Sequence, residues 1–220
     1  MSNELIEKLK RNEVLTPLEV KCVLDYIVSS VSLEHQIDRE NFKAYYTNQK
    51  EIEISDYTHC FETSVKIGRL CDAFNIYYNM YTLKDLGIPD LDHYFGIITF
   101  NTKEPLSFII DLTYIQFLES TYPIYRDNKT VNIISPSTFI KEENKKSLIF
   151  DGYITCTQEN LKDYIGSFIE SIMGKNFNED IVNQAFDKIK PITVISKVED
   201  FTQLINQKHQ ESNHKWYLKR

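Results

Sequence analysis

The sequence predicts an α+β fold in which a buried helix packs on an antiparallel sheet, with further helices before and after this core. Three observations support this class. Residues 1–35 carry apolar side chains at helical spacing, and most of 136–210 does the same. Between them, residues 55–120 combine a helix that is apolar around most of its surface with runs of β-forming residues. At about 150 residues per domain, the whole chain, 1–220, is expected to form a single domain.

Two helices are expected before the core, over 3–12 and 17–31. Pro17 favours the start of the second helix, because proline is well tolerated at the first helical position. The apolar residues of that helix recur every three or four positions, at Val20, Val23, Leu24, Ile27 and Val31. Residues 34–58 are polar and irregular, apart from an alternating run at 51–54 that is typical of a short strand.

A helix from about 59 to 75 is predicted to be largely buried, and Cys60 falls in its first turn. Its apolar residues spread over most of the helical surface: Phe61, Val65, Ile67, Leu70, Cys71 and Phe74. The run that follows, 76–81, is rich in β-forming residues. Glycine and proline within 86–90 then indicate a break in regular structure.

Two strong strands follow, over 93–100 and 106–112. Only the five residues 101–105 separate them, and these include polar residues and a proline. Such a short connection predicts an antiparallel hairpin. His93 opens the first strand of this hairpin, and Asp111 lies near the end of the second.

The last third of the chain is predicted to be mostly helical, with helices over 157–173, 178–189 and 197–207. The apolar face of the first of these consists of Leu161, Tyr164, Ile165, Phe168, Ile169 and Ile172. No internal repeat or low-complexity linker interrupts the order of helices, sheet and helices.

Composition disfavours several classes of function. The six glycines are scattered, so neither a phosphate-binding P-loop nor a dinucleotide-binding fingerprint is present. A net charge of −7 argues against a broad nucleic-acid interface. No apolar run approaches about 18 residues, so no membrane span is expected. The first residues lack the apolar core of a Sec-type signal, which predicts a cytoplasmic protein or export by another route.

The four cysteines, Cys22, Cys60, Cys71 and Cys156, show no C-x-x-C spacing. A structural zinc site and a disulfide framework are therefore disfavoured, and free thiols are expected. Either all four are small core residues, or one of them is a reactive thiol. No cofactor or metal is required by the pattern.

Cys60, His93 and Asp111 stand out by their placement. The antiparallel register of the predicted hairpin folds the end of its second strand back beside the start of the first, which brings Asp111 near His93. The buried helix could then direct its first turn, with Cys60, against that edge of the sheet. The three side chains would form a catalytic cluster.

These residue types suit a cysteine nucleophile. A helix N-terminus carries about half a positive charge, which favours a thiolate, and a neighbouring imidazolium favours it further. An Asp that accepts from the other ring nitrogen orients the imidazole. The backbone N–H of Cys60 is a candidate oxyanion donor. The expected chemistry is attack on an acyl carbon, a thioester intermediate, and transfer to water or to an amine.

The order of Cys, His and Asp on helix, strand and strand resembles the papain-like and transglutaminase-like cysteine enzymes. Asp111-Leu112-Thr113 is similar to the Asp-x-Thr that often closes the transglutaminase-type core. Spacings of 33 and 18 residues look like those of compact members, including arylamine acetyltransferases and bacterial effector deamidases and proteases. The resemblance covers roughly 55–120 and implies Cys60 as nucleophile, His93 as general base and acid, and Asp111 as the orienting group.

The sequence also departs from these families. Phe61 follows the cysteine where papain-type enzymes carry Trp, and the Trp that often lies two residues after the His in transglutaminases is missing. Asn48 and Gln49 lie upstream of Cys60, and the choice between them as the second oxyanion donor stays open.

Other constellations are weaker. His59 is adjacent to Cys60, and adjacent residues on a helix do not face each other. Asp90 and Asp92 with His93, or His209 with His214, are alternative metal ligands, but a charged turn and a polar terminus explain them more simply. The tyrosine cluster Tyr77, Tyr78 and Tyr81 and the pair Tyr45-Tyr46 are expected to pack rather than bind a ligand.

The sequence thus predicts a cysteine hydrolase, of peptidase or deamidase type, that cleaves an amide through a thioester. Its acidic balance favours a basic protein or peptide substrate. Transfer of the acyl group to an amine is the first alternative. The second is a non-catalytic protein with a degenerate triad, which binds a partner through its C-terminal helices, for example through Phe168 or Phe201.

Overall fold

The α+β class is confirmed by a computed structural model, which describes residues 1–34, 37, 60–84, 86, 93–114, 123–126, 129–132, 138–173 and 176–192. The helices in these residues are α1 (Asn3–Lys10), α2 (Pro17–Glu34), α4 (Cys60–Ala73), α5 (Glu142–Phe150), α6 (Gln158–Met173) and α7 (Glu179–Lys188). The strands are β1 (Tyr77–Thr82), β2 (Tyr94–Phe100), β3 (Leu106–Ile110), β4 (Pro123–Arg126), β5 (Lys129–Asn132), β6 (Tyr153–Thr155) and β7 (Pro191–Ile192).

Most of the expected elements are present close to their predicted limits. The two N-terminal helices, the Cys60 helix and the helices near 157–173 and 178–189 appear as α1, α2, α4, α6 and α7. The hydroxyl of Ser2 caps α1 by accepting from the Leu5 backbone N–H at 3.3 Å. The short strand expected at 51–54 and the helix expected over 197–207 lie outside the described residues.

The central sheet has five strands in the order β6-β3-β2-β1-β7, and every pair of neighbours is antiparallel. The predicted hairpin is confirmed as β2 and β3, with Gly96 opposite Ile110 and Phe100 opposite Leu106. β4 and β5 pair separately from this sheet. The chain order and the register together put the start of β2 and the end of β3 at the same end of the sheet.

The expectation of a mostly helical C-terminal third omits two strands. β6 pairs with β3 and β7 pairs with β1, so this third supplies both edges of the sheet. With three and two residues, they are too short to show the alternation from which strands are predicted.

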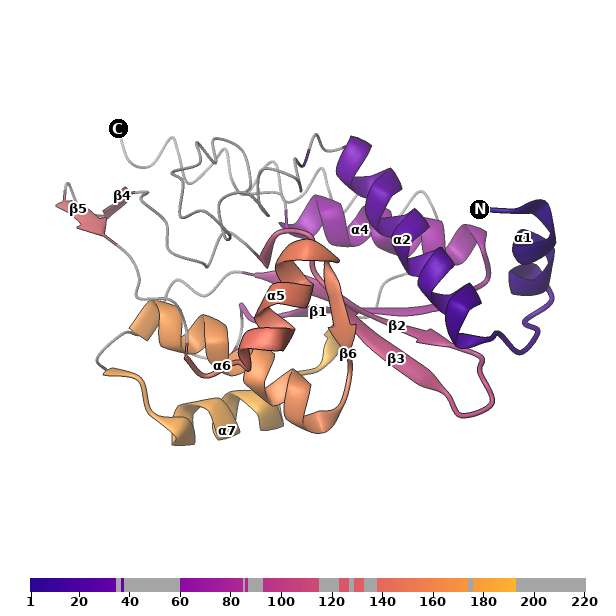
Figure 1. Cartoon of the computed structure of the whole chain (residues 1–220). Helices are drawn as coiled ribbons and strands as arrows, with labels where there is room; N and C mark the ends of the chain where they lie inside the picture. The colour runs from indigo at the N-terminus through magenta and orange to yellow at the C-terminus, as the bar shows by residue number, and fades with distance from the viewer. Residues whose placement is uncertain are drawn as a thin grey trace.

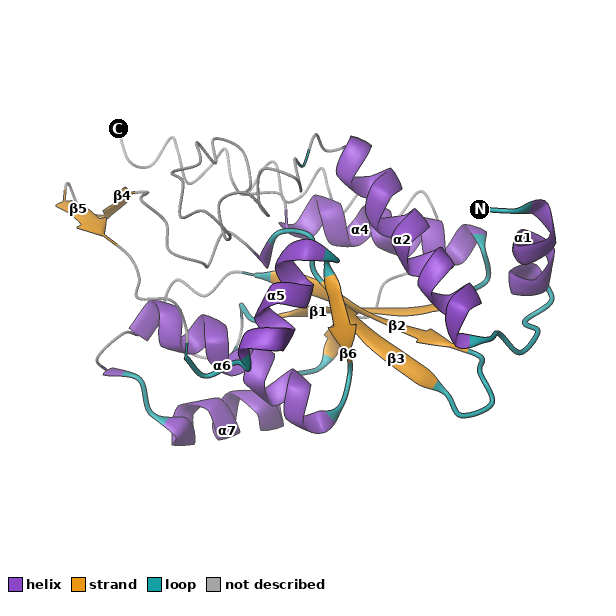
Figure 2. Cartoon of the chain, in the orientation of Figure 1, coloured by secondary structure: helices purple, strands orange, loops and turns teal. Residues whose placement is uncertain are grey.

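Helices lie on both faces of the sheet (Figures 1 and 2), with α2 and α4 on one side and α6 and α7 on the other. Tyr78 lies on the α4 face, since its hydroxyl donates to the Ser64 carbonyl of α4 at 2.7 Å. Phe95 lies on the opposite face, where its ring is 4.8 Å from the ring of Tyr164 in α6. The sheet is therefore covered by a helical layer on each face.

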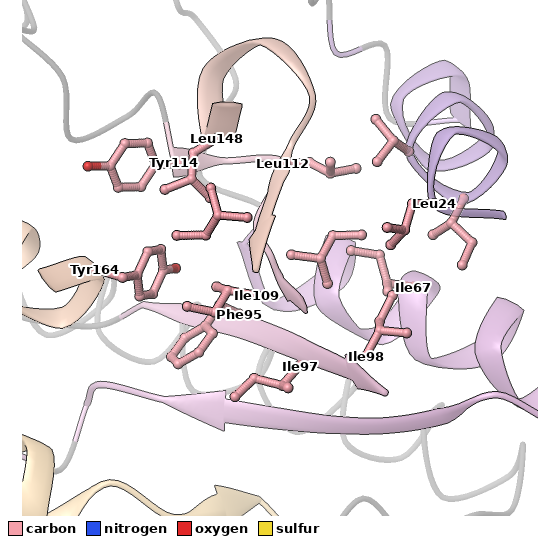
Figure 3. Close-up of a cluster of buried hydrophobic side chains, with 14 of the residues drawn as sticks. Leu24, Ile67, Phe95, Ile97, Ile98, Ile109, Leu112, Tyr114, Leu148 and Tyr164 are labelled. Carbon is pink, nitrogen blue, oxygen red and sulfur yellow. The ribbon is translucent and has the colours of Figure 1, made fainter. Parts of the chain in front are cut away.

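A continuous hydrophobic core joins the layers (Figure 3). Figure 3 shows side chains from α2, α4, β2, β3, α5 and α6 converging on the central strands. Phe95, Ile98, Ile109 and Tyr164 have no exposed surface. Within the described residues, no helix is both long and apolar enough to cross a bilayer.

Candidate active site

His93 and Asp111 meet at the end of the sheet where β2 begins and β3 ends. His93 Nε2 is 2.8 Å from Asp111 Oδ2, and the two side chains are 0% and 2% exposed. The backbone holds both positions, because the Leu83 N–H donates to the His93 carbonyl and the Asp111 N–H donates to the Gly152 carbonyl, each at 2.9 Å. The contact that the hairpin register predicts is therefore present.

The carboxylate of Asp111 accepts a full set of hydrogen bonds. Its Oδ1 accepts from the backbone N–H and the hydroxyl of Thr113, both at 2.9 Å. Its Oδ2 accepts from His93 and from the hydroxyl of Tyr164, both at 2.8 Å. Two ionised oxygens offer about four lone-pair sites, so every site on this carboxylate is used. That saturation is what permits a charge at this depth.

Cys60 is the first residue of α4 and is 8% exposed. Its side chain lies close enough to the ring of His93 to raise the pKa of that imidazole. Because Nε2 of His93 faces Asp111 and Tyr164, Nδ1 is the ring nitrogen left for the thiol. The imidazole thus bridges the sulfur at a helix N-terminus and a buried carboxylate.

The electrostatics of the pair favour its charged form. Burial by itself would lower the pKa of His93, but the charge of Asp111 and hydrogen bonds with Asp111 and Cys60 raise it to about 9. Burial would raise the pKa of Asp111, but the charge and hydrogen bond of His93, with the other donors, lower it below its ordinary value. At neutral pH the pair is therefore an imidazolium beside a carboxylate.

α6 contributes two residues that sequence reasoning placed only on an apolar face. The Tyr164 hydroxyl is 2.8 Å from Asp111 Oδ2 and 3.3 Å from His93 Nε2. Burial and the charge of Asp111 raise the pKa of Tyr164 well above its ordinary value, so the phenol keeps its proton. Phe168 stacks on the His93 ring at 4.6 Å. One feature of the sequence could have identified Tyr164 as part of the site. Its hydroxyl lies within an apolar helical stripe, and a buried phenol needs a hydrogen-bond partner.

Two glycines let α4 approach the sheet closely enough to place Cys60. A Cβ on Gly68 of α4 would lie 3.0 Å from the ring of Tyr78, and one on Gly96 of β2 would lie 2.2 Å from it. Phe61, next to Cys60, makes an edge-to-face contact with Tyr94 at 5.1 Å. The first turn of α4 is thereby fixed against the start of β2.

The remaining sequence candidates are dispersed or undescribed. Cys22 is exposed, Cys71 is buried and Cys156 is intermediate, and all are free thiols. Tyr81 stacks on Phe95 as expected for packing, whereas Tyr77 is 63% exposed. Several candidates lie outside the described residues: Tyr45, Tyr46, Asn48, Gln49, His59, Asp90, Asp92, Phe201, His209 and His214. In the described ranges no three His, Cys, Asp or Glu side chains gather as a metal site.

No protein-family model, curated protein or solved structure shows significant similarity to the chain. The residues of the site and their contacts are therefore the basis for an assignment.

Replacing Tyr164 by Phe should lower the free energy of unfolding by about 1.5–3 kcal/mol, because it removes a hydrogen bond to a buried charge. Tyr114→Phe is the matched control, since its hydroxyl bonds the neutral Ser167 hydroxyl at 3.1 Å and should cost only about 1 kcal/mol. Urea unfolding at pH 6 measures both. Equal losses would mean that Tyr164 does not stabilise a charged carboxylate.

The free energy of unfolding should depend on pH, because His93 and Asp111 form a buried ion pair. The raised pKa of His93 adds stability that is complete below its ordinary value of 6.5 and is lost as pH rises toward 9. The lowered pKa of Asp111 adds stability above its ordinary value of 3.8 that is lost in stronger acid. The advantage of the natural chain over His93→Gln should therefore shrink between about pH 6.5 and 9, as followed by urea unfolding. A constant advantage would indicate a neutral His93.

Proposed function

We propose that the chain is a cysteine-dependent acyl-transfer enzyme that hydrolyses an amide through a thioester, with Cys60 as nucleophile. The observation that carries the proposal is the position of His93, which is 2.8 Å from Asp111 and close enough to Cys60 for the cysteine to raise its pKa. A buried imidazolium beside a thiol at a helix N-terminus favours the thiolate form. The proposed papain-like or transglutaminase-like core rests on the same order of helix, strand and strand.

The reaction follows from these positions. The Cys60 sulfur attacks the amide carbon and forms a C–S bond, and the carbonyl oxygen takes the negative charge. His93 gives its proton to the leaving amine as the C–N bond breaks. His93 then takes a proton from water, which attacks the thioester and releases the carboxylic acid and the thiolate. Asp111 keeps the imidazole oriented throughout, because its other lone pairs are already occupied.

The first backbone N–H groups of α4 have no partner within the helix, since an α-helix satisfies its N–H groups only from the second turn. The N–H of Cys60 is therefore our proposed first oxyanion donor. The candidates for the second oxyanion donor are Asn48 and Gln49, and the choice between them stays open. The proposed substrate is a basic protein or peptide, cleaved at a peptide bond or deamidated at a glutamine side chain, which the net charge of −7 favours.

Alkylation of the four thiols tests the nucleophile without knowledge of the substrate. We expect iodoacetamide to modify Cys60 at pH 6 faster than the exposed Cys22, although Cys60 is buried, because a helix N-terminus and an adjacent imidazolium activate a cysteine nucleophile. Burial raises the pKa of Cys156 to about 11 and that of Cys71 well above its ordinary value, so both should react slowly. Peptide mass spectrometry follows each site within one sample.

Two controls complete the alkylation experiment. His93→Gln should bring the rate of Cys60 at pH 6 below that of Cys22, while the rate of Cys22 itself stays unchanged. A Cys60 that reacts more slowly than Cys22 in the natural chain would contradict the proposal and would favour a binding protein with a degenerate triad.

A substrate screen separates hydrolysis from transfer. Mixed protein substrates rich in lysine and glutamine should release ammonia or new amino termini with the natural chain and not with Cys60→Ala. Adding a fluorescent primary amine should leave the product unlabelled if water is the acceptor. Labelling of the substrate would instead establish amine transfer, and release that persists in Cys60→Ala would overturn the assignment.

A further inference from the structure

A second feature lies at the opposite end of the sheet from Cys60, where β1 begins and β2 ends. It is an open cavity of about 590 Å³, bounded by the end of α1, the end of α4 and the connection between β2 and β3. This volume falls in the range of small-ligand sites, which is roughly 300–1,000 Å³. The proposed catalytic chemistry makes no use of it.

The cavity is electrostatically negative. Glu13 and Asp72 both line it, and no lysine or arginine is among its described lining residues. Two helices also end at its wall, and each end continues into an asparagine with left-handed backbone, Asn12 at φ 53° and Asn75 at φ 56°. A helix C-terminus carries about half a negative charge, so both helices add to the potential of the carboxylates.

Two asparagines of the cavity wall, Asn75 and Asn101, present amide oxygens as acceptors. The amide nitrogen of Asn75 donates to the Lys10 carbonyl at 3.3 Å, and that of Asn101 donates to the Asn12 carbonyl at 2.7 Å. These bonds fix which atom of each amide is the oxygen. Within the described chain, neither amide oxygen receives a recorded hydrogen bond. The lining hydroxyls of Thr99 and Tyr78 are also engaged, by Ser107 and by the Ser64 carbonyl.

Nearby basic residues do not cancel this charge. Lys10 pairs with Glu7 at 3.2 Å, and neither lines the cavity. Arg11 approaches Glu13 at 3.6 Å, but both side chains are well exposed, at 68% and 44%, so the pairing is weak. Asp72 has no recorded cationic partner in the described chain.

We propose that this cavity binds an organic cation with several N–H donors, of the alkylammonium or guanidinium class. Such a group carries the positive charge that the two carboxylates favour and the N–H donors that amide oxygens accept. Tyr77 lines the cavity and is 63% exposed, so the face of its ring is open to a ligand. Aromatic faces attract ammonium and guanidinium groups through cation–π interactions, which favours an organic cation over a metal ion. The same chemistry occurs in a free polyamine-like amine and in a basic side chain of a polypeptide.

The test compares three probes on the full chain at low salt. Agmatine represents the free cation, N-acetyl-argininamide represents a peptide-linked guanidinium, and N-acetyl-citrullinamide is its neutral analogue. Amide NMR follows the side-chain NH₂ signals of Asn75 and Asn101. We expect at least one cation to shift both signals with saturation, and the neutral analogue to bind at least about tenfold more weakly.

Variants separate this cavity from general acidity of the surface. Glu13→Gln with Asp72→Asn should raise the Kd of the cation about tenfold, whereas the control Asp187→Asn on the exposed surface of α7 should leave it unchanged. Tyr77→Ala provides a second variant, at a side chain that is 63% exposed, and should also raise the Kd. Binding of argininamide alone would identify a polypeptide as the source of the cation, and binding of agmatine would identify a free amine.

Three outcomes would overturn the proposal. These are equal binding of the citrulline analogue, absence of saturable shifts with either cation, and an unchanged Kd in the double variant when its urea midpoint matches that of the natural chain. Because none of these measurements depends on Cys60, failure of the catalytic proposal would leave the result interpretable.

Discussion

The buried carboxylate of Asp111 is the constraint on which the rest of the site depends. An ionised group with 2% exposure is strongly destabilising unless donors satisfy it, and here they come from the start of β2, from the chain just after β3 and from α6. These donors converge only if three features are correct: the hairpin register, the turn at Thr113 and the packing position of α6. The charge thus selects one arrangement of three elements that hydrophobic packing alone would define less sharply.

That arrangement determines what Cys60 can do. His93 is held on one ring nitrogen by Asp111 and on its face by Phe168, so its orientation toward the first turn of α4 is fixed. α4 is fixed in turn by Tyr78, whose hydroxyl bonds the carbonyl of Ser64, one helical turn after Cys60. The sulfur and the imidazole are therefore positioned by opposite faces of the same sheet, which limits their relative movement.

The sequence allowed the hairpin, the buried helix and the contact of His93 with Asp111 to be predicted, because alternation, helical periodicity and a short turn are local signals. Tyr164 could not be assigned a partner in this way. Its contact with Asp111 joins residues 53 apart through the packing of α6, and one helical stripe does not specify which hydroxyl it meets. β6 and β7 were missed because their pairing is set by the exposed edges of β3 and β1 rather than by their own two or three residues. The cavity was missed for a related reason, since Glu13, Asp72 and Asn101 come from three separate segments.

The two proposed sites lie at opposite ends of β2, and this spacing limits how they can act together. Seven residues separate His93 from Phe100, which in an extended strand corresponds to about 23 Å. A polypeptide held in the cavity by a basic side chain would need roughly seven extended residues to reach Cys60, whereas a free amine bound there could not contact the proposed thioester. Distance therefore excludes an acyl acceptor bound in the cavity. The cavity is better suited to recognise a polypeptide substrate at a point remote from the reacting bond than to supply an amine for transfer.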